Sequence, residues 1–256
     1  MQHFTRATVA ALTLGFASVA AANIVFNDPT VSPASYTTLI YSNDPTVNIA
    51  VSATALGNPG AALQVLFTNS GGPVNLVSLE GFLNPAFAYD PALQGAIQSV
   101  GFSNDRYVDF GATLNPFLTV FSRVLLLQGG KYYFAAFLDP QVRGAFYTSA
   151  APSPFSAADF SLFDFNTGVA DPLQHPDFSS AGSLIDFGFA SRYTLNTFGT
   201  SFALDGGYRF DNISITVNAV PEPSTLALVC LGLAVAGVCA RRRKAMPRIE
   251  RAPALA

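Results

Sequence analysis

The sequence lacks tryptophan altogether and has only two cysteines among its 256 residues, Cys230 and Cys239. Both cysteines lie in one apolar run near the C-terminus, so the long body that precedes them can form no disulfide bond. A zinc site built on thiolates is excluded from the body for the same reason. The body must instead be stabilised by its apolar core, to which 23 phenylalanines and nine tyrosines contribute.

Charged residues are also scarce, at 11% of the chain against about 25% in ordinary globular domains. Residues 23–220 contain 14 acidic and 6 basic residues, a net charge of −8. A body with this balance is not expected to bind nucleic acid. The remaining basic charge lies near the termini, chiefly in Arg241, Arg242, Arg243 and Lys244. That asymmetry indicates membrane topology rather than ligand binding.

Residues suited to catalysis are few. His175 is the single histidine of the body and no G-x-S-x-G turn occurs, so a Ser-His-Asp triad is not expected. Glu80 is its single glutamate, so a glycoside hydrolase, which needs two facing carboxyl groups, would have to recruit aspartates. No glycine motif for phosphates or dinucleotides is present. We therefore predict a protein that is not an enzyme and needs no cofactor.

Four oxygen-bearing residues lie close together in the segment after residue 150. They are Asp159, Asp164, Asn166 and Asp171. Calcium accepts carboxylate and amide oxygens without thiolate or imidazole, so these residues are a calcium candidate, although their spacing does not match an EF-hand. The alternative is that they serve in turns, where Asp and Asn are common.

Residues 1–22 have the organisation of a secretory signal peptide. A short polar stretch carries Arg6, the apolar run Ala7–Val19 follows, and the segment ends in three alanines. Ala20 and Ala22 fit the small-residue positions that signal peptidase reads, which predicts a mature chain beginning at Asn23. The run is short for a membrane span, which disfavours an uncleaved anchor.

The C-terminal segment combines three features in a fixed order. Pro221-Glu222-Pro223 forms an extended strip, because proline disfavours regular pairing and biases the preceding residue toward extended backbone. An uncharged run at about 224–240 follows, just long enough for a membrane helix. The basic stop Arg241 to Lys244 then predicts a cytoplasmic end, with residues 245–256 as a cytoplasmic tail and the body outside.

Together, residues 219–244 resemble the PEP-CTERM sorting signal of bacteria that make extracellular polysaccharide. The resemblance implies that an exosortase, a membrane cysteine transpeptidase, cuts near the Pro-Glu-Pro strip. It also implies an inner-membrane precursor whose body is then delivered to the cell surface or released. The residues after the basic stop are a departure, since such proteins often end soon after it.

The body, residues 23–218, shows short apolar runs separated by Gly, Pro, Asn and Asp, the pattern of an all-β domain. We expect strands at Tyr36–Tyr41, Thr46–Val51, Ala61–Phe67, Val74–Leu79, Ala96–Phe102, Tyr107–Phe110, Phe117–Leu127, Lys131–Leu138, Leu184–Phe189, Ser201–Leu204 and Tyr208–Val217.

Two local predictions are specific. The strands flanking Gln128-Gly129-Gly130 should form a central hairpin, because glycine accepts the positive φ of a tight turn. In the last strand the apolar parity switches after Phe210, so a bulge at Asp211-Asn212 should return both halves to the core. Residues 150–183, rich in Pro, Phe and Asp, should be a long crossover loop with aromatic anchors.

About eleven strands in fewer than 200 residues favour a two-sheet sandwich with jelly-roll connections. The segments LLLQGGKYYFAAF and GGYRFDNISITV are also similar to the sandwich bodies of other PEP-CTERM proteins, some of which resemble carbohydrate-binding modules. The predicted role is structural or interactive, in a polysaccharide-rich envelope or biofilm. A carbohydrate-binding module with a definite glycan ligand is the alternative, and a glycoside hydrolase the third.

Overall fold

A computed structural model describes residues 23–109, 119–137, 142–199, 201 and 203–220. Their strands form two antiparallel sheets, while helix is limited to α1 (Pro91–Gln94) and two single 3₁₀ turns, Pro33–Ser35 and Ala157–Asp159. The predicted all-β sandwich of two sheets is therefore confirmed. No helix in these ranges is long and apolar enough to cross a membrane. The predicted signal peptide and C-terminal helix lie outside the described residues.

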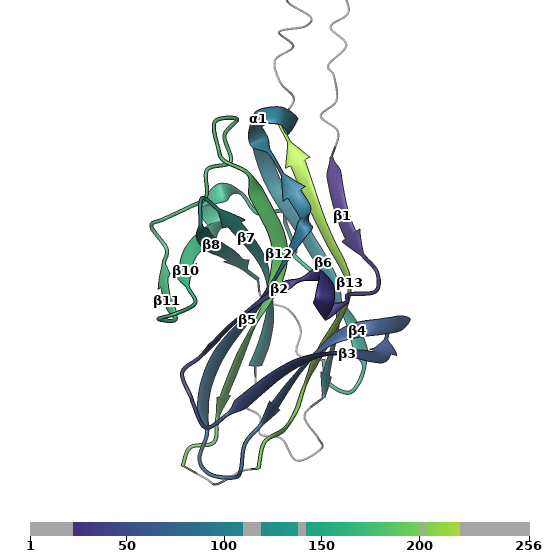
Figure 1. Cartoon of the computed structure of the whole chain (residues 1–256), viewed down its shortest axis with the longest axis vertical. Helices are drawn as coiled ribbons and strands as arrows, with labels where there is room; N and C mark the ends of the chain where they lie inside the picture. Colours follow the sequence, from purple (N-terminus) through teal and green to yellow (C-terminus); the bar gives the residue numbers. More distant parts are fainter. Residues whose placement is uncertain (1–22, 110–118, 138–141, 200, 202, 221–256) are drawn as a thin grey trace, which may run out of the picture. The chain divides into compact units, whose positions relative to one another are not determined.

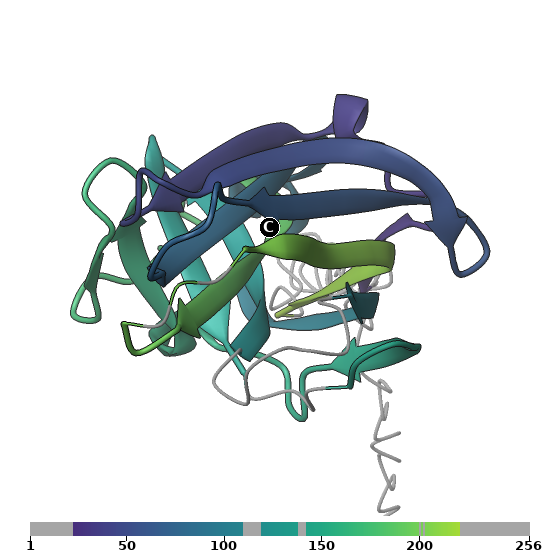
Figure 2. The same cartoon turned by 90° about the horizontal axis from the view of Figure 1, so that it is seen from below.

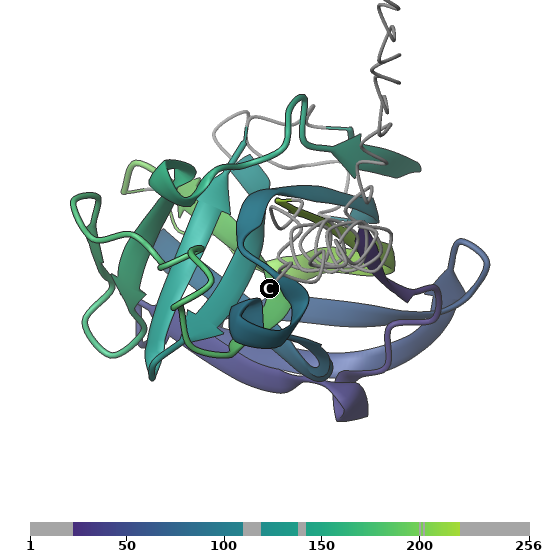
Figure 3. The same ribbon diagram turned by 90° about the horizontal axis from the view of Figure 1, so that it is seen from above.

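The first sheet has six strands. Its order is β3 (Asn48–Gly57), β4 (Gly60–Thr68), β13 (Asp205–Ala219), β6 (Ile97–Asp109) and β9 (Phe146–Ala150), with β1 (Ile24–Asp28) also paired to β13. Strand β1 runs beside β13 in Figure 1. Figures 2 and 3 show the long, curved blue strands β3 and β4 at one edge of the body and the teal β9 at the opposite edge.

The second sheet has seven strands. Its order is β11 (Val169–Asp171), β10 (Phe160–Asp164), β8 (Lys131–Ala136), β7 (Thr119–Gln128), β12 (Ile185–Asn196), β5 (Asn75–Tyr89) and β2 (Thr37–Ser42). The predicted hairpin is confirmed as β7–β8, joined by Gly129 at φ +57° and Gly130 at φ +76°. Both strands have neighbours on either side, so the hairpin has the central position that was predicted.

The connections between the sheets follow a jelly-roll order. The four strands β4-β13-β6-β9 are neighbours in one sheet, and the four strands β5-β12-β7-β8 are neighbours in the other. Because the chain passes from β4 to β5, from β5 to β6 and from β6 to β7, it crosses between sheets at each of these steps. Two Greek keys folded together in this way make a jelly roll.

The main core lies between the two sheets, where one face of every long strand contributes apolar side chains. The predicted bulge in β13 is present, because its register with β6 shifts between Asp211 and Ser214 and Asn212 adopts φ +50°. The apolar residues on both sides of it are all fully buried: Tyr208, Phe210, Ile213, Ile215 and Val217.

Other predictions need correction. Residues 150–183 are not only a loop, because they contain the β10–β11 hairpin, although Phe155, Phe160, Phe163 and Phe178 are buried anchors as expected. Strands β1 and β9 were not predicted. The two strands expected at 96–102 and 107–110 are one strand, β6, and the residues described between 201 and 204 are not a strand.

Candidate functional site

The outer face of the seven-stranded sheet carries a second, smaller apolar cluster. Its buried members are Leu79, Leu83, Leu125, Phe163 and Ala190, and six partly buried side chains pack against them: Leu39, Tyr41, Leu127, Tyr132, Phe134 and Phe165. Outer faces of sheets are usually polar, since they meet water. An apolar outer face here implies that something in the fold covers part of it.

The β10–β11 hairpin supplies that cover. Tyr41 lies on β2, the last strand of the sheet order, yet its ring touches the backbone of Gly168 in the β10–β11 turn at the opposite edge. Its ring also meets Phe163 of β10 edge-on, with centroids 6.0 Å apart. The sheet must therefore curl until its two edges meet over the outer face.

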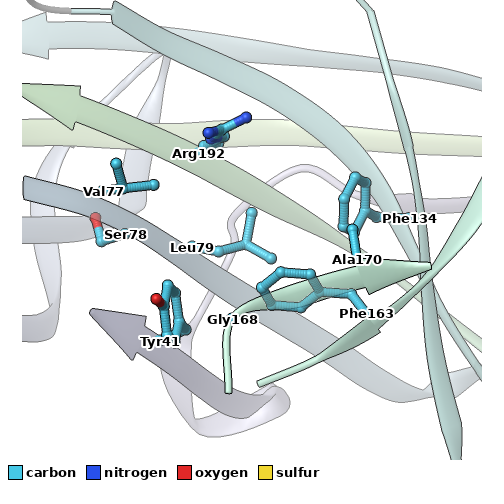
Figure 4. Close-up of a pocket in the computed structure, with 9 residues that line it drawn as sticks. All are labelled: Tyr41, Val77, Ser78, Leu79, Phe134, Phe163, Gly168, Ala170 and Arg192. Atoms are coloured by element: carbon cyan, nitrogen blue, oxygen red, sulfur yellow. The ribbon is translucent and has the colours of Figure 1, made fainter. Parts of the chain in front are cut away.

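A groove remains beside this closure. Its lining residues surround Leu79 in Figure 4, with Arg192 on one side and Tyr41 and Phe163 on another. The register places Tyr41 opposite Leu79, Leu79 opposite Arg192, and Arg192 opposite Phe121 on adjacent strands. The volume of the groove is about 140 Å³, close to that of a cavity that holds one six-membered ring.

The groove combines aromatic walls with one cation. Phe134 of β8 lines the groove. Arg123 of the adjacent strand β7 is not part of the lining, but its guanidinium carbon lies 4.5 Å from the centroid of the Phe134 ring. No aspartate or glutamate lies among the described residues of the lining. A site of this kind can hold a flat apolar surface against a ring while Arg192 pairs with an anionic or strongly polar group.

A wider hollow of about 340 Å³ also has Phe163 in its lining. Tyr132 and Phe165 contribute rings to it, and Lys131 and Asp164 contribute opposite charges. Lys131 is already engaged, since its ammonium group donates to Oε1 of Gln174 at 3.1 Å. This second hollow therefore offers less free charge than the groove.

Glu80 is fully buried on the inner face of β5 and accepts a hydrogen bond from the hydroxyl of Tyr208. Burial raises the pKa of Glu80 to about 7, against which the Tyr208 hydrogen bond acts in the opposite direction. Burial, together with the neighbouring carboxyl group of Glu80, raises the pKa of Tyr208. Because Glu80 lies between the sheets, the single body glutamate is not placed where it could act on a polysaccharide.

The four residues of the calcium candidate are used in local turns. Asp164 accepts from the Asn166 amide and the Thr167 hydroxyl, and hydrogen bonds from these neighbours lower its pKa. Asp171 accepts from the Leu173 amide and from Gln174, again with a lowered pKa. Asp159 closes a capping box with Ser156. Within the described ranges no three His, Cys, Asp or Glu side chains come together in a way that could hold a metal ion.

His175 lies beside the start of β10, where its Nδ1 is 2.7 Å from the carbonyl oxygen of Phe160.

The sequence analysis did not single out the groove residues Tyr41, Phe134, Phe163 and Arg192, because it assigned most aromatic rings to the core. One signal was available: Arg192 interrupts the apolar strand IDFGFASRYTLN at a position whose side chain points away from the core. The predicted signal-cleavage and sorting residues lie outside the described part of the chain: Ala20, Ala22, Pro221, Glu222, Pro223 and Arg241 to Lys244.

Comparison with known families identifies the C-terminal segment. Residues 219–244 match the family described as the PEP-CTERM protein-sorting motif. The match has the boundaries expected from the Pro-Glu-Pro strip, the apolar run and the basic stop. The predicted sorting signal is thereby confirmed, and with it the assignment of the chain as an exported protein of the type that exosortases process.

No curated protein matches the chain. Among solved structures, a chain from work on carbohydrate-binding modules of the β-sandwich superfamily is similar over 72% of this chain and 55% of its own length. The TM-score is 0.32 and the sequence identity is 7%. A similarity of this degree does not define a ligand.

Proposed function

We propose that the chain is an envelope protein whose β-sandwich body acts without catalysis in a polysaccharide-rich surface layer or biofilm, after an exosortase has processed its tail. The sorting motif at residues 219–244 carries this proposal. Body and tail have separate tasks, since the tail directs the chain and the body remains afterwards.

The finer steps follow from the ends of the sequence. Signal peptidase cuts after Ala22, leaving Asn23 as the first residue and β1 starting at Ile24. The run at about 224–240 then holds the precursor in the inner membrane, with Arg241 to Lys244 on the cytoplasmic side. Cleavage near Pro221 to Pro223 frees the body for the cell surface or the medium.

A non-catalytic role is supported by the placement of the candidate catalytic groups. Glu80 is enclosed in the core and His175 contacts a backbone carbonyl. The runner-up, a module with a definite glycan ligand, is supported by the aromatic groove that Arg192 lines. A glycoside hydrolase would need two aspartates facing across a sugar, and turnover abolished by replacing one specific aspartate would establish it.

The sorting proposal is tested by replacing Pro221, Glu222 and Pro223 together with alanine. Membrane insertion depends on the apolar run, so we expect this variant to be exported but to accumulate at full length in the inner membrane. Fractionation and a blot with antibody to the body measure this, in hosts with and without the exosortase. The intact mass of the released wild-type body also reports whether it begins at Asn23.

Neutral replacement of Arg241 to Lys244 is the matched comparison. It leaves the strip intact but weakens the stop, so some chains should pass entirely through the membrane. If wild type and the triple-alanine variant are processed identically, the tail is an ordinary membrane anchor and the exosortase proposal fails.

A further inference from the structure

Arg192 differs from every other basic side chain of the body. Arg209 pairs with Asp109 at 3.6 Å and Lys131 donates to Gln174. Arg106, Arg123 and Arg143 also make interactions. Arg192 has no hydrogen bond, ion pair or ring contact within the described residues, although it is exposed in the middle of a strand of the seven-stranded sheet.

The side chains around Arg192 are arranged around a ring-sized space. Leu79 and Val77 of β5 are part of the lining, together with the rings of Tyr41, Phe134 and Phe163. The position of the Tyr41 ring is fixed, because it packs against Gly168 and Phe163. Its hydroxyl makes no hydrogen bond within the described part of the chain, so it can donate to a ligand.

The charge of the groove is opposite to that of the body. Residues 23–220 carry a net charge of −8, yet the lining contains a single charged side chain, and it is positive. An unpaired guanidinium favours a carboxylate, to which it can donate two parallel hydrogen bonds. The rings and Leu79 favour a ligand that also presents an apolar face, which a free inorganic anion lacks.

We propose that this groove binds one carboxylated pyranose ring, a uronic acid unit of an acidic polysaccharide, with its carboxylate on Arg192 and its ring against the Tyr41 side of the groove. The volume of about 140 Å³ suits one such ring. The choice of a polysaccharide as the source of the ligand rests on the proposed envelope role. The groove itself does not depend on how the chain is sorted.

The test uses the processed protein purified from its exporting host and two probes, oligogalacturonate and the same oligomer fully methyl-esterified. Titration calorimetry at low salt measures both affinities. We expect the acid to bind at least tenfold more tightly than the ester, because esterification removes the charge that Arg192 meets. Binding of the acid should weaken as salt is raised.

Variants separate the groove from general electrostatics. Arg192→Gln should weaken oligogalacturonate binding about tenfold or more, since a hydrogen bond to a charged group is lost. Lys131→Gln removes the same charge elsewhere and should change the affinity less than twofold. Tyr41→Phe keeps the ring against Gly168 but removes the hydroxyl, and should weaken binding by a few-fold. Thermal melts establish that each variant is folded.

Three outcomes would overturn the proposal: equal binding of acid and ester, equal effects of Arg192→Gln and Lys131→Gln, or displacement of the oligomer by inorganic phosphate at the concentration at which galacturonate displaces it. The last result would make the groove a small-anion site. None of these outcomes affects the sorting proposal, because Arg192→Gln should be exported and processed like wild type.

Discussion

Glu80 and Arg192 lie on the same sheet, and their side chains meet opposite environments. Parity decides this, because successive side chains of a strand point to opposite faces. Glu80 points inward with Ser191 of β12 beside it, whereas Arg192, the next residue along β12, points outward beside Leu79. A sequence search for paired acids cannot see this difference, since it depends on which face the second sheet covers.

The buried acid makes stability depend on pH. The pKa of Glu80 is about 7 in the folded protein against 4.5 for an ordinary glutamate, so the folded state holds a proton that the unfolded chain releases between these values. Stability is therefore highest below pH 4.5 with respect to this group, falls as pH rises, and levels off above 7. The total change is roughly 3 kcal/mol.

We expect Glu80→Gln to remove this term, since the amide stays neutral and can still accept from Tyr208. Urea unfolding should give nearly equal stabilities at pH 4.5 and a more stable variant at pH 8. Asp44→Asn is the control: hydrogen bonds from Thr46 lower the pKa of this half-buried carboxyl, so its contribution to stability is present above its ordinary pKa of 3.8 and is lost only in acid. Its replacement should therefore change the stability by the same amount at pH 4.5 and at pH 8. Parallel curves for wild type and Glu80→Gln would contradict the assignment.

At the scale of elements, short-range signals predicted short-range structure. The β7–β8 turn and the β13 bulge each leave a local mark, a glycine pair in one case and a parity switch in the other. The curl of the seven-stranded sheet leaves no such mark. It depends on Tyr41 meeting Gly168, residues more than 120 positions apart, so the groove could not be assembled from the sequence.

Gly168→Ala tests this closure. Gly168 has φ +72°, and an added Cβ would lie 1.9 Å from Cζ of Tyr41. Gly144 has φ +70° with nothing near its Cβ position, so Gly144→Ala carries the backbone cost alone. That cost is about 1–2 kcal/mol. We expect Gly168→Ala to lose about 1–3 kcal/mol more, because the ring must move. Equal losses in chemical unfolding would show that the two edges do not meet.

At the scale of the whole molecule, the body should need neither disulfide nor metal. Residues 23–220 contain no cysteine, and the three aspartates of the calcium candidate already accept hydrogen bonds in turns. A domain of nearly 200 residues buries enough apolar surface to fold without such support. We expect reductant, EDTA and millimolar calcium each to leave the melting temperature unchanged.

A calcium-dependent rise in melting temperature that disappears in Asp164→Asn or Asp171→Asn would instead make that segment an ion site.

The general fold class could be predicted from the sequence because it rests on composition and on the spacing of turns. The jelly-roll order of the strands was favoured only by the number of strands, and the partners of β1 and β9 followed from no local pattern.

The central place of β13 in its sheet sets an order of events during export. Strand β13 pairs with β1, β4 and β6. These three strands come earlier in the chain, so each lacks this hydrogen-bonding partner until β13 follows. A chain that crosses a membrane from its N-terminus presents residues 24–196 before residues 205–219 arrive. The six-stranded sheet therefore cannot close until the residues that lead into the sorting motif have emerged, so completion of the fold coincides with the arrival of that motif.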